Sequence, residues 1–161
     1  MDAISDLAAQ VLDLARAHDA KLATAESCTG GLVSAALTEI AGSSSVVDRG
    51  FVTYSNEAKS ELLGVPMILI ETHGAVSEDV ARAMAEGALA RSHAQFAVSI
   101  TGVAGPGGGT DAKPVGLVWF AMAGAGRATQ TLEQRFGDVG RSKVRALSVE
   151  TALTLFRDAL C

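Results

Sequence analysis

Aromatic residues and cysteines are scarce in this sequence. Only 4% of the 161 residues are aromatic although 48% are apolar, so a core has to be built mainly from Ala, Val, Leu and Ile. That apolar content excludes an intrinsically disordered chain. The two cysteines, Cys28 and Cys161, are too few for a disulfide framework and lack the paired spacing of a zinc site. We therefore expect free thiols and no metal site, since His73 and His93 also stand alone.

Positive charge is in deficit as well. The 13 Lys and Arg residues against 18 Asp and Glu residues leave a net charge of -5, so we expect no nucleic-acid partner. The longest apolar stretches, such as residues 115–123, are far shorter than the roughly twenty residues of a membrane-spanning helix, so we expect no membrane association. The first ten residues contain Asp2 and Asp6 but no basic segment like that of a secretory signal. We therefore expect a cytoplasmic protein.

Hydrophobic periodicity predicts strands that alternate with helices. Helices are expected over residues 3–18, 32–40, 55–64, 78–92 and 139–159, and strands over residues 21–25, 46–54 and 95–100. Two further strands, 115–122 and 128–132, flank Gly124-Ala125-Gly126 and are expected to form an antiparallel hairpin. This order is typical of an α/β protein, here a three-layer α/β/α fold with a mixed, mostly parallel sheet of about five strands. The length fits a single domain over residues 1–161, because no repeat or linker interrupts the pattern.

The first predicted strand is followed by a turn that opens a helix, Glu26-Ser27-Cys28-Thr29-Gly30-Gly31. The turn presents hydroxyls, a thiol and backbone amides at the positive end of a helix dipole, where an anion or polar ligand can bind. Ser27 or Thr29 can equally act only as a helix cap, which is the commoner role of such residues. A third interpretation makes Cys28 a nucleophile with a lowered pKa, although no histidine is next to it in the sequence.

A second group of polar residues surrounds the next predicted strand. Ser43, Ser44 and Ser45 precede that strand, and Tyr54 and Lys59 follow it. A serine hydroxyl becomes a nucleophile when a base removes its proton, and a desolvated lysine can be that base, with tyrosine as a proton relay. Serine, lysine and tyrosine thus provide a nucleophile, a base and a relay, and no histidine is needed. The residues alone do not choose among the three serines, and a loop of serines with a solvated lysine is the structural alternative.

Glycine is concentrated after the buried strand that ends at Ile100. Gly102, Gly105, Gly107, Gly108 and Gly109 let the backbone approach a ligand closely and direct amides at negative charge. The segment matches neither the P-loop nor the dinucleotide fingerprint. A flexible linker is the alternative, but long structureless loops between apolar strands tend to be functional.

The last predicted helix begins with an unusual charge pattern. Arg141, Lys143 and Arg145 oppose the helix dipole there, which indicates either a compensating anion, such as a phosphate or carboxylate, or a solvated face.

Five segments in order resemble the CinA C-terminal domain family, the nicotinamide-nucleotide amidohydrolases: AESCTGG, AGSSSVVDRGFVTYSNEAK, HGAVSEDVA, SITGVAGPGGGTDAKPVG and FGDVGRSKVR. The resemblance covers nearly the whole chain. It implies hydrolysis of the carboxamide of nicotinamide mononucleotide to nicotinate mononucleotide and ammonia, with neither a metal nor an organic cofactor. By position in the motif, Ser44 matches the family's nucleophile, Lys59 its general base and Tyr54 the neighbouring hydroxyl.

The resemblance also implies which residues surround the substrate. Backbone amides beside Ser44, or the Thr101 hydroxyl, are the expected donors to the oxyanion. The residues expected to bind the nucleotide come from the two glycine-containing loops and the basic helix start: Glu26, Ser27, Thr29, Gly30, Gly31, Gly102, Gly105, Gly107, Arg141 and Arg145.

Two other functions compete with this one. The same loops would also suit a catalytically silent nucleotide-binding or regulatory domain, a function that the family's link to competence and DNA damage suggests. An amidase with Cys28 as its nucleophile is the enzymatic alternative. In either case, helices rich in Ala and Leu leave apolar surface for contacts between subunits, so we expect a homo-oligomer.

Overall fold

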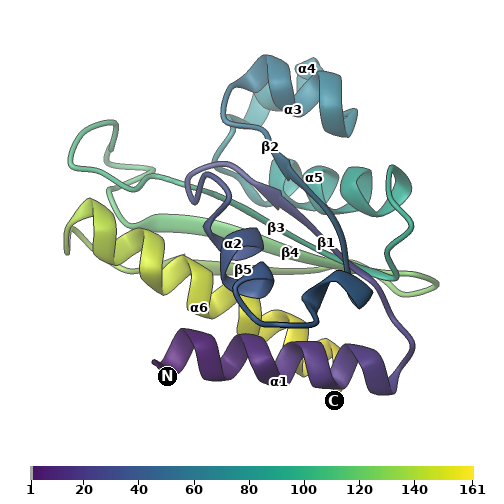
Figure 1. The fold of residues 1–161 in the computed structure, drawn as a ribbon. Helices are drawn as coiled ribbons and strands as arrows, with labels where there is room; N and C mark the ends of the chain where they lie inside the picture. The colour runs from purple at the N-terminus through teal and green to yellow at the C-terminus, as the bar shows by residue number, and fades with distance from the viewer. Residues whose placement is uncertain (1) are drawn as a thin grey trace.

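The computed structural model describes residues 2–161, which form one five-stranded sheet between two layers of helices (Figure 1). The strands, in the spatial order β2-β1-β3-β4-β5, are β1 (Leu22–Glu26), β2 (Val47–Val52), β3 (Phe96–Gly102), β4 (Leu117–Gly124) and β5 (Gln130–Arg135). Strands β1, β2 and β3 are mutually parallel, and β4 is antiparallel to both β3 and β5. Only β4 therefore runs against the other four. The prediction of a mixed, mostly parallel sheet with a late hairpin is confirmed.

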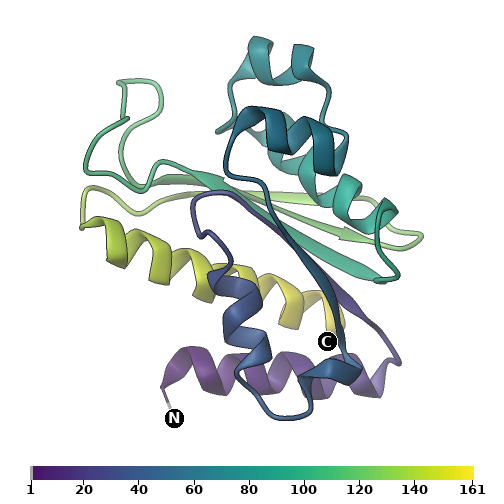
Figure 2. The same ribbon diagram turned by 45° about the horizontal axis from the view of Figure 1, so that its top comes forward.

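The helices cover both faces of the sheet (Figures 1 and 2). One layer contains α1 (Ala3–Ala17), α2 (Leu32–Thr38) and α6 (Arg141–Leu160), and the other contains α3 (Asn56–Leu63), α4 (Met67–His73) and α5 (Glu78–Ala90). The three-layer α/β/α prediction is thus confirmed. Within residues 2–161, no helix combines the length and apolarity needed to cross a membrane.

Local signals explain where the helices begin and end. Side-chain oxygens of Asp2, Ser55 and Ser77 accept hydrogen bonds from the first-turn amides of α1, α3 and α5. Gly64 ends α3 in the left-handed conformation that glycine adopts without strain. Helix α4 was not predicted, because it is seven residues long and buries only Ile70, so no apolar periodicity marks it.

The register of the sheet determines which residues meet at its edge. Glu26, the last residue of β1, pairs with Val52 of β2 and Ile100 of β3. The residues that follow these three positions therefore leave the sheet side by side, at the carboxyl ends of parallel strands. Ligands gather at this edge in open α/β sheets.

Helix α3 is held against α5 at a point where only glycine fits. A Cβ added to Gly87 would lie 2.0 Å from the backbone oxygen of Leu63, the last residue of α3. We expect Gly87→Ala to lower the free energy of unfolding by about 1–3 kcal/mol, because backbone would have to move to accept the methyl group. Urea denaturation followed by circular dichroism measures the change.

The matched control for this prediction is Gly107→Ala. A Cβ on Gly107 would meet nothing within 4 Å. Equal unfolding free energies for the two variants would contradict the overpacking argument.

Candidate active site

A cavity of about 280 Å³ lies at the carboxyl edge of the sheet. It is enclosed by the turn after β1, the segment from β2 into α3, the α4–α5 connection, the glycine-rich loop after β3 and the start of α6. The residues that line it are Ser27, Cys28, Tyr54, Asn56, Lys59, Ala75, Val76, Thr101, Gly102, Val103, Ala104, Gly105, Gly107, Gly108 and Arg141.

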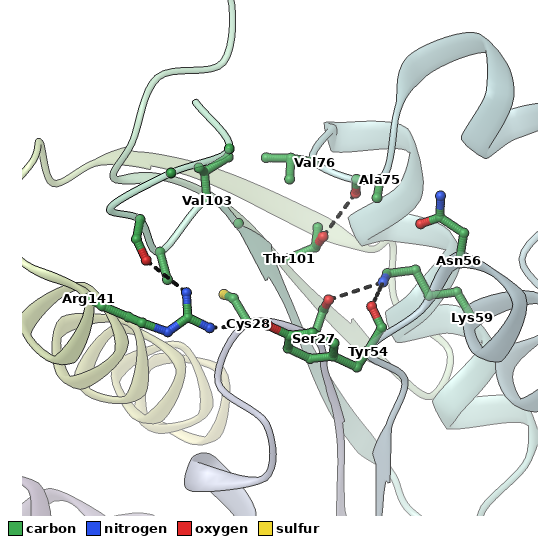
Figure 3. Close-up of a pocket in the computed structure, with 15 residues that line it drawn as sticks. Ser27, Cys28, Tyr54, Asn56, Lys59, Ala75, Val76, Thr101, Val103 and Arg141 are labelled. Carbon is green, nitrogen blue, oxygen red and sulfur yellow. Dashed lines mark hydrogen bonds between the residues drawn. The ribbon is translucent and has the colours of Figure 1, made fainter. Parts of the chain in front are cut away.

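Ser27 and Lys59 are in direct contact in this cavity (Figure 3). The Lys59 Nζ atom lies 3.0 Å from Ser27 Oγ and 2.9, 3.2 and 3.5 Å from the backbone oxygens of Thr53, Tyr54 and Ser55. A neutral amine has two N–H groups and one lone pair. Lys59 therefore donates to Ser27 Oγ as an ammonium, whereas in the neutral form two of the three carbonyls can take both N–H groups and the lone pair can accept the Ser27 proton.

Lys59 is buried without a carboxylate partner. Its side chain is 1% exposed, and it forms no salt bridge with any of residues 2–161. Burial disfavours the ammonium form and lowers the pKa of Lys59 below its usual value of 10.5, against a smaller upward influence of Cys28. The amine is thus more available as a base than a solvated lysine.

The expected pairing of Ser44 with Lys59 is wrong. Ser44 is exposed on a short 3-10 helix (Ser43–Ser45) that precedes β2, whereas Lys59 follows β2. A six-residue strand separates the two ends by about 20 Å. None of the three serines lines the cavity. Ser27 is the serine beside Lys59, because β1 and β2 are parallel neighbours and the segments that follow them share one edge.

Glu26 and Thr29, expected to bind substrate, do not line the cavity. Both are fully buried, and Glu26 accepts hydrogen bonds from the Thr29 hydroxyl and from the amides of Val33 and Ser34. The carboxylate therefore caps α2, and the expectation that these two side chains contact the substrate is wrong, because both side chains are used in this cap.

Gly30, Gly31 and Arg145 are also outside the cavity lining, which corrects their expected role as substrate ligands. The two glycines have φ angles of 57° and 104°, which provide the left-handed turn before α2. The Arg145 guanidinium donates to the backbone oxygens of Cys28 and Thr29 at 3.1 and 3.3 Å. Its donors are directed at the turn rather than at the cavity.

Arg141 does line the cavity, together with the start of the glycine-rich loop. It donates to the Gly105 backbone oxygen at 2.8 Å and to the Tyr54 hydroxyl at 3.1 Å (Figure 3). Tyr54 thus contacts Lys59 through its backbone oxygen, while its hydroxyl faces Arg141. This geometry does not support the expected relay of a proton through the Tyr54 hydroxyl.

Thr101 lines the cavity but its only hydroxyl proton is already used. Its Oγ1 donates to the backbone oxygen of Ala75 at 2.9 Å (Figure 3). In this arrangement the hydroxyl can accept a further hydrogen bond but cannot donate one to an oxyanion, contrary to expectation.

Asn56, Ala75 and Val76 line the cavity but were not among the expected site residues. Asn56 could have been identified from the sequence, because it lies between Tyr54 and Lys59 in the segment that follows β2. Ala75 and Val76 carry no chemical signal in the sequence. Among residues 2–161, no cluster of three or more His, Cys, Asp or Glu side chains could hold a metal ion.

The Cys28 thiol is poorly suited to act as a nucleophile. Burial raises its pKa to about 11, from 9.0 for a free thiol, so the thiolate is about 100-fold rarer at neutral pH. We expect iodoacetamide to modify the exposed Cys161 first and Cys28 about 100-fold more slowly, as measured by peptide mass spectrometry. Denatured protein, in which both thiols should react alike, is the control. Rapid modification of Cys28 in the folded protein, prevented by substrate, would restore the cysteine mechanism.

Comparison with known proteins assigns the chain to a family. The model of the CinA C-terminal domain matches residues 4–160. A CinA-like protein of Mycolicibacterium vanbaalenii is 58% identical over 86% of this chain, and one of Mycobacterium marinum is 54% identical over 98%. These matches cover 33% and 36% of the two relatives, so the chain spans about a third of their length.

Solved structures agree in both fold and length. The competence/damage inducible protein CihA from Agrobacterium tumefaciens superposes with a TM-score of 0.96 at 51% identity, over 99% of this chain and 96% of that one. A CinA superfamily protein from Klebsiella pneumoniae has a TM-score of 0.93 at 37% identity, over 99% and 98% of the two chains. The order of the motifs, the fold and these matches together show that the chain belongs to the CinA C-terminal domain family.

Proposed function

We propose that this protein is an amidohydrolase that converts nicotinamide mononucleotide to nicotinate mononucleotide and ammonia. Ser27 is the nucleophile and Lys59 the general base. The observation that carries the proposal is the 3.0 Å contact between Lys59 Nζ and Ser27 Oγ, formed by a lysine that is 1% exposed. A binding domain has no need of a serine paired with a desolvated amine.

The first half of the reaction forms an acyl-enzyme. Lys59 takes the Ser27 proton as Oγ attacks the amide carbon, and the resulting ammonium then protonates the leaving nitrogen, which departs as ammonia. The oxyanion needs fixed donors. The backbone amide of Thr29, two residues after Ser27, suits this role, because it donates to no acceptor within residues 2–161.

The second half regenerates the enzyme. Neutral Lys59 removes a proton from a water molecule that attacks the nicotinoyl ester, and Ser27 leaves with that proton. Thr101 Oγ1 retains acceptor capacity and lies on the cavity wall, where it can orient this water.

Arg141 and the glycine-rich loop suit the phosphate of the substrate. Arg141 is the only Arg among the cavity-lining residues, and the flanking loop residues Gly105, Gly107 and Gly108 bring backbone close to a ligand. The pyridinium ring would then lie toward Lys59, where its positive charge further disfavours the ammonium form of the lysine.

The test is product formation by the purified protein. Nicotinamide mononucleotide is incubated with enzyme, and both ammonia and nicotinate mononucleotide are quantified, since equal amounts of the two are expected. Isothermal titration with the same nucleotide is run in parallel. Binding without ammonia release would contradict the proposal in favour of a silent nucleotide-binding domain.

A further inference from the structure

The turn that carries Ser27 is held from two sides by charged side chains that do not line the cavity, the buried Glu26 and the half-buried Arg145. Glu26 contacts it from the side of the α2 amides, and Arg145 contacts its carbonyl oxygens from α6. Neither residue lines the cavity, so neither is placed to touch substrate. Binding of substrate therefore does not explain why these two charged residues lie at the turn.

Glu26 fixes the start of α2 relative to β1. Its Oε1 accepts from the Thr29 hydroxyl at 2.6 Å and the Val33 amide at 2.9 Å, and its Oε2 accepts from the Ser34 amide at 3.1 Å. The residue at the N-cap position, Gly31, has no side chain to cap the helix. The amides of α2 thus stabilise the buried carboxylate. Because Glu26 directly precedes Ser27, these hydrogen bonds hold the start of α2 beside the Ser27 turn.

Arg145 fixes the other side of the turn across the longest sequence separation in the site. Its Nε donates to the Cys28 oxygen and its Nη2 to the Thr29 oxygen. Gly30 lies beside this contact, where a Cβ would be 3.4 Å from Arg145 Nη2, and its φ of 57° gives the turn its left-handed conformation. A cation on the Cys28 oxygen also polarises the peptide bond between Cys28 and Thr29, which makes the Thr29 amide a stronger donor.

We propose that Glu26 and Arg145 are a pair of positioning residues that hold the Ser27 turn in its reactive geometry. Together they keep Ser27 Oγ in line with Lys59 and strengthen the Thr29 amide, the proposed donor to the oxyanion. This inference rests on the proposed function. A positioning role and a substrate-binding role have different kinetic signatures. Loss of positioning lowers kcat and leaves KM nearly unchanged.

The first test compares two substrates that differ only in the phosphate, nicotinamide mononucleotide and nicotinamide riboside. The variants are Arg145→Met, Arg145→Lys and Glu26→Gln, with Lys143→Met, at an exposed position two residues earlier in α6, as the control for loss of a positive charge. We expect kcat to fall about 10- to 100-fold in Arg145→Met and Glu26→Gln for both substrates, with KM within about threefold. Arg145→Lys should recover part of the loss, since an ammonium reaches one of the two carbonyls.

A raised KM confined to the mononucleotide would overturn the proposal, because it would mean that Arg145 binds the phosphate. An unchanged kcat in Arg145→Met and Glu26→Gln would overturn it as well. The Lys143→Met control should resemble the parent protein for both substrates.

The second test requires no natural substrate. A fluorophosphonate ester labels an activated serine: Oγ forms a bond to phosphorus, fluoride leaves and the proton passes to the base. Intact-mass spectrometry gives the labelling rate of Ser27, and circular dichroism checks that each variant is folded. We expect the rate to fall in Arg145→Met and Glu26→Gln by about the same factor as kcat.

The labelling test separates the two proposals. Labelling of the parent protein without hydrolysis of the nucleotide would contradict the proposed substrate, and the positioning proposal would then be judged on the labelling rates alone. Folded variants that label as fast as the parent would overturn the positioning proposal. A parent protein that neither labels nor hydrolyses would overturn both, since there would be no reactive serine to position.

Discussion

Replacing Ser27 by alanine is expected to abolish hydrolysis of nicotinamide mononucleotide, with kcat at least about 10⁴-fold lower than in the parent protein. The reason is that the variant has no atom within reach of Lys59 Nζ that can form an ester with the acyl group. The substitution removes one oxygen from a partly exposed cavity wall, so the fold should be retained. Steady-state ammonia release measures the effect.

Ser44→Ala is the matched control for this substitution. Ser44 is an exposed serine before β2, and the change removes the same atom at the far edge of the sheet. We expect its kcat and KM to equal those of the parent protein. Activity that depended on Ser44 and survived in Ser27→Ala would contradict the assignment of the nucleophile.

Lys59→Met should lower kcat/KM by about 10³- to 10⁴-fold, because Ser27 then has no base. Lys59→Arg should be nearly as inactive, since a guanidinium stays protonated and cannot accept the serine proton. The two variants separate base catalysis from positive charge. Substantial activity in Lys59→Arg would show that the charge, and not the basicity, is what the reaction requires.

The pH dependence expected of the parent protein's activity follows from the same residue. Burial lowers the pKa of Lys59 below 10.5, and only the neutral amine is a base. Activity is therefore expected to rise with pH through this lowered pKa and to reach a plateau before a solvated lysine would titrate. The rise should be absent from the residual activity of Lys59→Met. A profile that rises identically in both proteins would contradict the role of Lys59.

The pH dependence of protein stability tests the lowered pKa of Lys59 without a substrate. Between the lowered pKa in the folded protein and the ordinary lysine pKa in the unfolded chain, the unfolded state binds more protons. The free energy of unfolding contributed by Lys59 therefore increases with pH across this window and decreases as pH falls. We expect the parent protein to gain stability relative to Lys59→Met as pH is raised, as measured by urea denaturation at several pH values.

Much of the architecture could be predicted from local pattern. The helices expected over residues 55–64 and 78–92 are present as α3 and α5, where Ser55 and Ser77 cap the first turns and Gly64 ends α3. The glycine-rich turn after residue 122 correctly indicated the antiparallel hairpin of β4 and β5. Helix α4 escaped prediction because most of its residues are at least partly exposed and give no periodic signal.

The site was only partly predictable. Lys59, Tyr54, Thr101 and the glycine-rich loop were identified and do line the cavity, because Thr101 lies at the end of β3 and the others lie in the segments that follow β2 and β3 at the same edge. Ser44 was paired with Lys59 by its position in the family motif, whereas contact with Lys59 depends on which ends of the strands meet.

Charged residues were the most misleading signal for predicting which residues contact the substrate. Glu26 and Arg145 resemble ligand-binding residues in a sequence, since charged side chains near glycine-rich turns commonly face anions. Burial and hydrogen-bond partners depend on neighbours that are distant along the chain, and Arg145 reaches Cys28 across 117 positions.

Composition, periodicity and turn chemistry were enough to establish an α/β sheet protein with its chemistry in the loops after the strands. These properties are short-range, because each depends on a few consecutive residues and on the burial of one face. The choice of Ser27 over Ser44, and of positioning over binding for Glu26 and Arg145, depended on strand order and register. Parallel neighbours bring together segments that follow strands, and this adjacency is set by long-range packing that no local window of sequence contains.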